Sequence, residues 1–175
     1  MTPRRPLARK PGFTGLINED MVSKADIRLR AIGAIDEASA SLGLAKAFLA
    51  DESAKDNLTS CQKHLSLIMA GLAGWKPENF VEELALALDS LEAMLTDLER
   101  RTKKPSAFLQ PGQTPAEGAL DMARALARRA ERETVSLAQS PFEAEVPEDA
   151  LTYLNRLSSL CFILLAAQAA NGENQ

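Results

Sequence analysis

Apolar residues recur at steps of three and four along most of the chain, which is the spacing of one buried face of an α-helix. The alternation that marks a β-strand is weak throughout. The pattern therefore predicts an all-α protein with helices over residues 23–50, 53–72, 78–104, 114–138 and 147–171. Because the connections between them are short, we expect the five helices to pack as an antiparallel bundle.

Residues typical of helix starts mark three of these helices. Ser23 is a side-chain cap for the first. In the run TPAE, Thr114, Pro115 and Glu117 fill the cap, first-turn and capping-box positions of the fourth. Pro147 opens the fifth. The fourth helix therefore has the best-defined start.

The chain length of 175 residues is normal for one domain. We expect a single helix-bundle domain over residues 23–171, a basic, loose N-terminal arm over 1–22 and a short tail over 172–175. The arm lacks the apolar stretch of a secretory signal, so we expect a cytoplasmic protein. The most apolar segment, 160–170, has about half the length needed to cross a bilayer, so we expect no membrane contact.

Charge and metal-ligating residues narrow the classes of function. Lys and Arg number 20 against 24 Asp and Glu, a net charge of -4 that argues against nucleic acid as a partner. Cys61 and Cys161 lack metal-site spacing, and buried free thiols are favoured over a disulfide. His64 is the only histidine, so it is interpreted as structural, and a His-based zinc or diiron site is excluded by count. We expect no metal site.

The fourth predicted helix carries a row of arginines. In ARALARRAER, Arg124, Arg128 and Arg132 recur at steps of four and stack on one face, while Arg129 points about 100° away. Guanidinium groups match phosphate oxygens in pairs, so a triphosphate is a suitable partner, with Glu131 orienting an arginine. The alternative is a solvated face whose arginines pair with nearby acids: Glu117, Asp121 and Glu133.

The fifth predicted helix contains the run YLNRLS. Asn155 and Arg156 are polar neighbours beside the apolar Leu154 and Leu157, which places them near a bundle edge. That position suits the rim of a binding site. The alternative is that Arg156 pairs with an acid on a neighbouring helix.

The connection before the fourth helix holds an aromatic residue. In AFLQPGQT, Phe108 lies on a turn with Pro111 and Gly112, so its ring can project into a pocket or close the end of the bundle.

The first predicted helix contains two acids in a stretch of small residues. Asp36 and Glu37 interrupt GAIDEASASLGLA. A buried carboxylate there needs a cation, and an arginine of the fourth helix can supply it. The pair can form within the chain or across a subunit interface, where small residues allow close approach.

Taken in order, SKADIRLRAIGAIDEASASLGLA, FLQPG, ARALARRAER and YLNRLS resemble the motifs of the ATP:cob(I)alamin adenosyltransferases, the family of the propanediol-utilisation and human mitochondrial enzymes. The resemblance covers about residues 23–171. It implies a cobalamin adenosyltransferase-like five-helix bundle that forms a homotrimer and binds ATP and the corrin where two subunits meet.

The resemblance implies transfer of the adenosyl group from ATP to cob(I)alamin, with release of triphosphate, and it also implies the family's requirement for Mg²⁺. The Co(I) centre attacks the 5′ carbon, and the protein supplies placement and charge. By motif position, Arg128 and Arg132 hold ATP and Glu131 orients them. Asn155 contacts the nucleotide, and Asp36 pairs with Arg128 across the interface.

Other positions enter the expected site in the same way. Phe108 matches the ring that the family places beneath the corrin, where it excludes the lower axial ligand of cobalt. Ser23, Lys24 and Arg28 match polar positions that the family has before the first long helix. The other expected binding residues lie in the ARALARRAER and YLNRLS motifs. The expected cofactor-binding residues are Ser23, Lys24, Arg28, Phe108, Arg124, Glu131, Asn155 and Arg156.

The N-terminal region departs from the family pattern. The family carries a loop TGDxGxT that cradles phosphates, whereas here Thr14 and Gly15 run straight into LINEDMV, so the cradle is interpreted as missing. Glu19 and Asp20 add negative charge nearby. Two alternatives to the enzyme therefore stay open: a noncatalytic member of the fold that binds a corrinoid or a nucleotide, and a helical interaction module.

Overall fold

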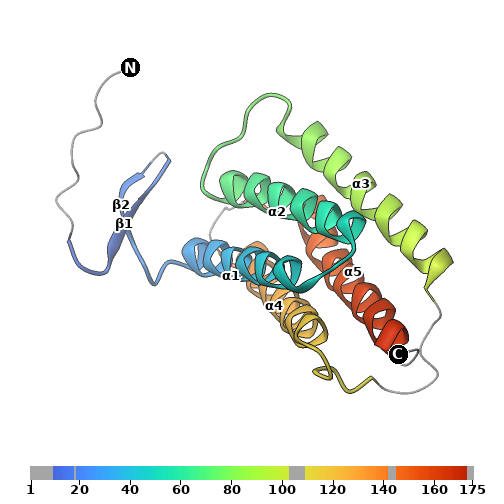
Figure 1. Ribbon diagram of the computed structural model, residues 1–175. Coiled ribbons are helices and arrows are strands. Elements are labelled where there is room, and N and C mark those ends of the chain that lie inside the picture. The colour runs from blue at the N-terminus through green and yellow to red at the C-terminus, as the bar shows by residue number, and fades with distance from the viewer. Residues whose placement is uncertain (1–9, 18, 103–108, 142–144, 173–175) are drawn as a thin grey trace.

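The computed structural model describes residues 10–17, 19–102, 109–141 and 145–172. It contains five helices after a short hairpin (Figure 1): β1 Phe13–Leu16, β2 Glu19–Ser23, α1 Ile27–Phe48, α2 Glu52–Leu72, α3 Phe80–Arg101, α4 Pro115–Ala138 and α5 Glu148–Gly172. The predicted all-α class and all five predicted helices are confirmed, with helix ends a few residues from those expected.

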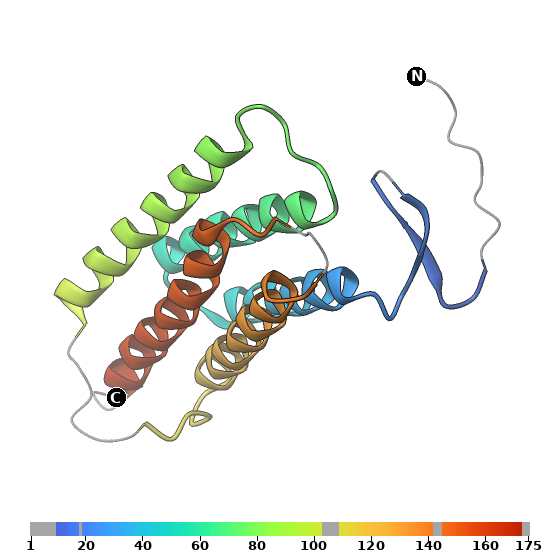
Figure 2. The same cartoon turned by 180° about the vertical axis from the view of Figure 1, so that it is seen from behind.

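The helices pack as a bundle in which α4 has a central place. It lies along α1 on one side and α5 on the other, while α2 packs against α1 and α3 packs chiefly against α5. Figures 1 and 2 show α3 at the edge of the bundle, far from α1 and α4. The two motif helices, α4 and α5, are therefore neighbours.

Helices α1 and α4 bury many alanines along the seam where they lie together, interspersed with larger side chains such as Ile35, Leu42 and Leu120. Small methyl groups allow two helices to approach closely. The buried alanines of this seam include Ala31, Ala34, Ala38, Ala45, Ala119, Ala123, Ala127 and Ala130. The largest buried side chains elsewhere include Leu58, Leu65, Leu84, Leu91 and Tyr153.

Helix α1 begins three residues later than predicted. Its cap is Asp26, whose Oδ1 accepts from the backbone N–H of Arg28 at 2.8 Å. Ser23 was expected to be the cap, but its hydroxyl accepts from the N–H of Ala25 at 3.2 Å, ahead of the helix. The predicted cap was wrong: aspartate and serine are about equally favoured at this position, so residue type does not select Ser23 over Asp26.

Helix α4 begins as predicted. Thr114 Oγ1 accepts from the N–H of Glu117 at 3.2 Å, and Pro115 stands in the first turn. The carboxylate of Glu117 accepts from the N–H of Gln113 at 3.1 Å. These bonds fix where the arginine-bearing face of α4 begins.

The hairpin was not predicted. Phe13 pairs with Ser23 and Thr14 with Val22 in an antiparallel register. The N–H of Ile17, between the strands, donates to the carbonyl of Ala73 at 3.2 Å. Part of the segment expected to be a loose arm is thus paired as strands, and residues 1–9 lie outside the described part of the chain.

By length and composition, α5 is apolar enough over Glu148–Ala170 to cross a membrane. The core helix of a bundle passes the same test, and α5 has that position, with Leu154, Leu157 and Leu160 fully buried. We therefore interpret its hydropathy as that of a core helix.

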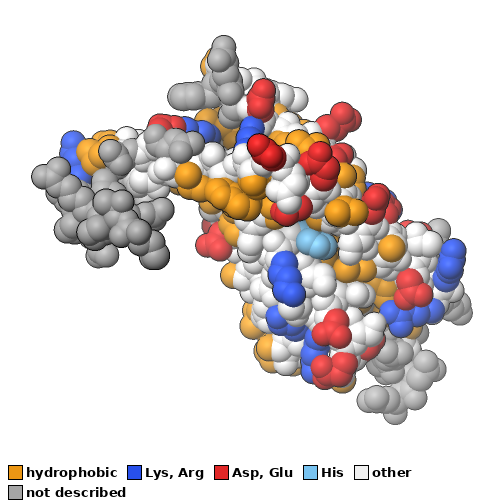
Figure 3. Space-filling view, turned by 90° about the horizontal axis from the view of Figure 1, so that it is seen from above, with side chains coloured by type: hydrophobic (Ala, Val, Ile, Leu, Met, Phe, Trp, Pro, Cys, Tyr) orange, Lys and Arg blue, Asp and Glu red, His pale blue; other side chains and the backbone are white. Residues whose placement is uncertain are grey.

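A small polar group lies between α2 and α5. His64 Nδ1 is 3.0 Å from the hydroxyl of Tyr153, and the two rings meet edge to face. Burial lowers the pKa of His64, and burial raises that of Tyr153. Cys61 and Cys161 are buried free thiols, as predicted, and burial raises the pKa of Cys61 to about 11. Figure 3 shows that part of His64 reaches the surface.

Candidate functional site

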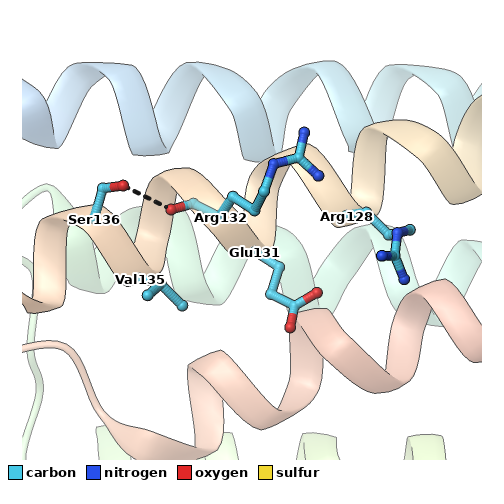
Figure 4. Close-up of a pocket in the computed structure, with 5 residues that line it drawn as sticks. All are labelled: Arg128, Glu131, Arg132, Val135 and Ser136. Atoms are coloured by element: carbon cyan, nitrogen blue, oxygen red, sulfur yellow. Dashed lines mark hydrogen bonds between the residues drawn. The ribbon is translucent and has the colours of Figure 1, made fainter.

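Helix α4 presents two arginines on an open pocket of about 400 Å³. Arg128, Glu131, Arg132, Val135 and Ser136 line it (Figure 4). Arg128 and Arg132 are exposed, and neither guanidinium group has a hydrogen-bond or ion-pair partner among the residues that the structure describes. In Figure 4 Arg132 extends toward α1 and Glu131 points toward α5. Two unneutralised guanidinium groups one turn apart favour an anionic ligand.

The expected row of three open arginines is shortened to two. Arg124 is held by Asp121, one turn earlier on α4, with Nε 2.8 Å and Nη2 2.7 Å from Oδ1. The interpretation as a face paired with nearby acids thus holds for Arg124. It does not hold for Arg128 or Arg132.

Glu131 binds an asparagine instead of the arginine expected from the sequence. Asn155 Nδ2 on α5 donates to Glu131 Oε1 at 2.9 Å. This bond joins the ARALARRAER and YLNRLS motifs across the α4–α5 contact. The structure therefore brings Arg128, Glu131, Arg132 and Asn155 together.

The acids of α1 are exposed, so the expectation of a buried carboxylate does not hold within one chain. Glu37 Oε2 lies 2.8 Å from Arg129 Nη1, which links α1 to α4. Asp36 has no partner in the described ranges, and neither has Arg128. Within the chain, the ion pair therefore joins Glu37 and Arg129, each of which is the sequence neighbour of a residue that was expected to pair.

Arg156 is turned away from Asn155, toward α3. Its Nε and Nη2 lie 2.5 and 2.7 Å from the two carboxylate oxygens of Glu92. Glu92 raises the pKa of Arg156. The alternative interpretation, an ion pair with an acid on a neighbouring helix, is what the structure contains, and Arg156 is separate from the α4 pocket.

The polar residues before α1 lie at the base of the hairpin. The guanidinium of Arg28 binds Glu19 and Asp26, and these bonds lower the pKa of both carboxyl groups. The negative charge of Glu19 is therefore offset by Arg28. Ser23 and Lys24 are exposed.

The start of α1 lies beside the end of α4. Arg30 Nη2 donates to Glu133 Oε2 at 2.9 Å. Since Glu133 follows Arg132, the segment that leads into α1 enters the bundle at the same end as the pocket. The side chain of Asp20 and all of Phe108 lie outside what the structure describes.

Sequence analysis missed an exposed aromatic residue on α5. Phe162 is 43% exposed and follows Asn155 by two helical turns, so both lie on one face. Its position in an otherwise apolar run concealed it. The signal that could have found it is the step of seven from Asn155.

A family model described as cobalamin adenosyltransferase matches residues 9–168. The chain belongs to this family. Corrinoid adenosyltransferase PduO of Salmonella typhimurium is 32% identical over 160 residues, which cover 90% of this chain and 47% of that protein. Corrinoid adenosyltransferase of Mycobacterium tuberculosis is 34% identical over 167 residues, with coverage of 93% and 86%. The chain thus spans about half the length of the PduO relative and most of the other.

Solved structures in the family share the fold. A single-residue variant of the PduO-type ATP:corrinoid adenosyltransferase from Lactobacillus reuteri, complexed with cobalamin and ATP, superposes with a TM-score of 0.74. The sequence identity is 25%, and the alignment covers 90% of this chain and 88% of that one. A second variant of the same enzyme, complexed with ATP, has the same TM-score at 26% identity.

The family match also includes the segment before the hairpin. The last part of the family motif TGDxGxT has the spacing GxT, which recurs here at Gly12 and Thr14. Gly12 has a φ of 82°, a backbone conformation that favours glycine. Lys10 then stands at the aspartate position of the motif, with its Nζ 4.7 Å from the centre of the Phe13 ring. The spacing at Gly12 and Thr14 was not considered when Thr14 and Gly15 were compared with the start of the motif.

Proposed function

We propose that this chain is an ATP:cob(I)alamin adenosyltransferase, which moves the adenosyl group of ATP onto the cobalt of the reduced corrinoid and releases triphosphate. The family match over residues 9–168 supports this. The observation that carries it is the pair of guanidinium groups of Arg128 and Arg132. They line a pocket beside the Glu131–Asn155 bond and have no partner among the described residues.

The two arginines would stabilise the leaving triphosphate. When the bond from the 5′ carbon to the phosphate oxygen breaks, its electrons pass to the triphosphate, which gains negative charge. Fixed guanidinium groups favour that state because they hold their charge at any working pH and need no reorganisation. The reduced corrinoid is itself the nucleophile, so no side chain of the protein has to attack. We therefore assign Arg128 and Arg132 to the triphosphate.

The other ligand contacts follow from position. Asn155 is assigned to the nucleoside. Phe162, on the same face of α5, offers an apolar surface to the corrin, and Phe108 keeps the assignment beneath the corrin that the resemblance gives it. Arg124 and Arg156 are assigned structural ion pairs instead.

The N-terminal segment is assigned to the phosphates as well. Gly12 and Thr14 keep the last part of the family loop, and Ser23 and Lys24 lie at the base of the same hairpin. The described residues hold no group of three or more His, Cys, Asp or Glu side chains that could bind a metal. Any Mg²⁺ would therefore enter with the triphosphate as part of the substrate.

We propose in addition that the protein is a cytoplasmic homotrimer. Asp36 on α1 and Arg128 on α4 lack partners in the described part of one chain, as expected of residues that pair between subunits. Exposed apolar side chains on the same two helices support a subunit contact there: Leu44, Phe48 and Met122. The free thiols agree with a reducing compartment. Light scattering after gel filtration tests the trimer, and Asp36→Arg should dissociate it.

The test of the activity is an anaerobic assay with chemically reduced cobalamin, ATP and Mg²⁺. Loss of the Co(I) spectrum and formation of a light-sensitive adenosyl product are followed. Turnover that requires Arg128 is the expected result. If the protein binds ATP or the corrinoid by calorimetry without turnover, the noncatalytic binding protein replaces the enzyme. The altered loop start at Lys10 is the observation that keeps this second function open.

A further inference from the structure

Three polar side chains meet in the contact between α2 and α5, outside the α4 pocket. His64 Nδ1 is 3.0 Å from the Tyr153 hydroxyl. The thiol of Cys61, one turn before His64 on α2, forms a side-chain hydrogen bond with the same hydroxyl. Tyr153 and Cys61 are fully buried, whereas part of His64 reaches the surface (Figure 3). The three groups therefore form a chain that leads from solvent at His64 through Tyr153 to Cys61 in the interior.

The direction of each bond in this chain depends on the other bonds, because a hydroxyl has one proton to donate. An unprotonated imidazole nitrogen is a good acceptor, whereas a thiol sulfur is a weak one. With His64 neutral, we therefore expect the Tyr153 hydroxyl to donate to Nδ1 and to accept from the thiol of Cys61. The proton of the His64 ring then lies on Nε2.

Protonation of His64 removes the acceptor that Tyr153 uses in the neutral state. Both ring nitrogens of an imidazolium carry a proton, so Nδ1 becomes a donor and the hydroxyl oxygen of Tyr153 has to accept from it. The hydroxyl proton then needs another acceptor. Among the described residues that bond to this hydroxyl, Cys61 supplies it through Sγ. His64 can thus take up a proton without losing its bond to Tyr153.

The surroundings favour the neutral form of His64. Burial lowers its pKa, and Lys63 is the one charged group in the described ranges that lowers it further. Tyr153 and Cys161, the titratable groups of α5 near this contact, are neutral because burial raises the pKa of each. On the α1 side, Lys46 is held by polar side chains of α2. As the pH falls through the ordinary value of 6.5, the unfolded chain takes up the proton first, so stability decreases until the lower, folded pKa is passed.

We propose that His64, Tyr153 and Cys61 form a pH-sensitive hydrogen-bond relay, in which protonation of His64 turns the Tyr153 hydroxyl from His64 to Cys61. The relay keeps α2 joined to α5 in both states, since His64 and Tyr153 stay bonded in each. This matters for α5 because α2 touches that helix along only a short stretch. Tyr153 precedes Asn155 by two residues, so the relay preserves the position of the YLNRLS motif as the pH changes. The inference does not depend on the identity of any ligand.

The test uses the unsubstituted full chain, in which His64 is the only histidine. Chemical shifts of its isotopically labelled ring nitrogens report the tautomer and the pKa. The infrared S–H stretching band of Cys61, identified by its loss in Cys61→Ala, reports the hydrogen bonds of the thiol. We expect the Nε2–H tautomer above the pKa, and a shift of the Cys61 band whose midpoint coincides with the pKa of His64. A neutral Nδ1–H tautomer, or a Cys61 band that stays constant while His64 titrates, would overturn the inference.

Tyr153→Phe removes the hydroxyl and keeps the ring, so the Cys61 band should no longer respond when His64 titrates. A band that still follows His64 would overturn the relay, because the charge would then act on the thiol without the hydroxyl. A thermal melt checks that this variant folds, and the two measurements on the unsubstituted chain stand without it.

Lys63→Ala is the matched control, since it removes a charge beside His64 and leaves the relay intact. The pKa of His64 should rise because a nearby cation is lost, and the midpoint of the Cys61 band should rise with it. A Cys61 midpoint that does not move with the pKa of His64 would contradict the relay.

Discussion

The arginines on the two sides of the bundle differ in whether an acidic side chain pairs with them. On the α4 side, Arg128 and Arg132 face solvent with no partner among the described residues, whereas on the α3 side both oxygens of Glu92 hold Arg156. Unpaired cations one turn apart repel each other and weaken a helix slightly. A paired arginine adds little stability at a surface but is no longer available to a ligand. Pairing within the chain, more than the sequence motif, therefore decides which arginines remain available to a ligand.

The largest effect should come from removing an open arginine. Arg128→Ala should lower turnover by about 100-fold or more, because a fixed charge that stabilises the leaving group is lost. The melting temperature should hardly change, since the side chain is exposed and makes no hydrogen bond or ion pair with other described residues. Steady-state kinetics and a thermal melt measure the two effects. Unchanged turnover would contradict a functional role for the open arginines of α4.

On the α3 side, a packing change should act on stability alone. A Cβ at Gly71 would lie 2.2 Å from a ring carbon of Phe80, which is buried. Gly71→Ala should therefore cost about 1–3 kcal/mol of unfolding free energy, as overpacking does. Denaturant unfolding measures this.

A glycine-to-alanine change elsewhere is the matched control for that prediction. A Cβ at Gly118 meets nothing closer than 3.9 Å, so Gly118→Ala should be neutral or slightly stabilising. Turnover of Gly71→Ala measured well below its melting temperature should stay close to that of the unsubstituted chain. A large loss there would mean that the two sides of the bundle are coupled.

The Arg156–Glu92 pair should have a smaller effect. Arg156→Ala and Glu92→Ala should each lower stability by about 1 kcal/mol or less, and the double variant by no more than the larger single change. Turnover should be retained, in contrast to Arg128→Ala. If Arg156→Ala instead abolishes turnover with stability intact, Arg156 belongs to the ligand site after all.

The smallest effect is expected from the Arg28–Asp26 ion pair at the start of α1. Arg28 lowers the pKa of Asp26, so the folded state favours the charged carboxylate and the pair contributes stability above the ordinary pKa of 3.8. This contribution is lost as the pH falls through the lower, folded pKa. Asp26→Asn keeps the cap but removes the charge.

Unfolding curves from pH 7 to pH 2 follow the effect of this change. The stability difference between Asp26→Asn and the unsubstituted chain should be below about 1 kcal/mol at pH 7 and should vanish in acid. A difference that persists at the lowest pH would show that the charge of Asp26 is not its cause.

Periodicity was enough to predict the helices, because each buries one continuous stripe. It was not enough for the hairpin, whose strands of four and five residues are too short to display alternation. The capping signals were equally local: Thr114 was identified because a capping box surrounds it, while Ser23 was chosen although Asp26, three residues later, is the cap.

The arrangement of the candidate residues followed from the sequence where a motif fixed it, but not where the rotation of a helix decided it. The closeness of Arg128, Arg132 and Asn155 follows from two motifs on adjacent helices. The partner of Arg156 is Glu92, 64 positions away, and only the mutual rotation of α3 and α5 selects it. Likewise, which of two adjacent acids on α1 meets α4 depends on a turn of about 100° that sequence spacing does not report.

The alanine seam between α1 and α4 sets limits on how this site can diverge. Ala127 and Ala130 are fully buried and flank Arg128 and Arg129 in sequence, so the α4 backbone that carries the arginines is packed against the interior of the bundle. An added carbon at these buried positions would overpack the contact, so α4 would have to shift together with its arginines. Natural substitutions that alter ligand preference are therefore expected at the exposed positions of α4 and α5, where a new side chain does not move the helices.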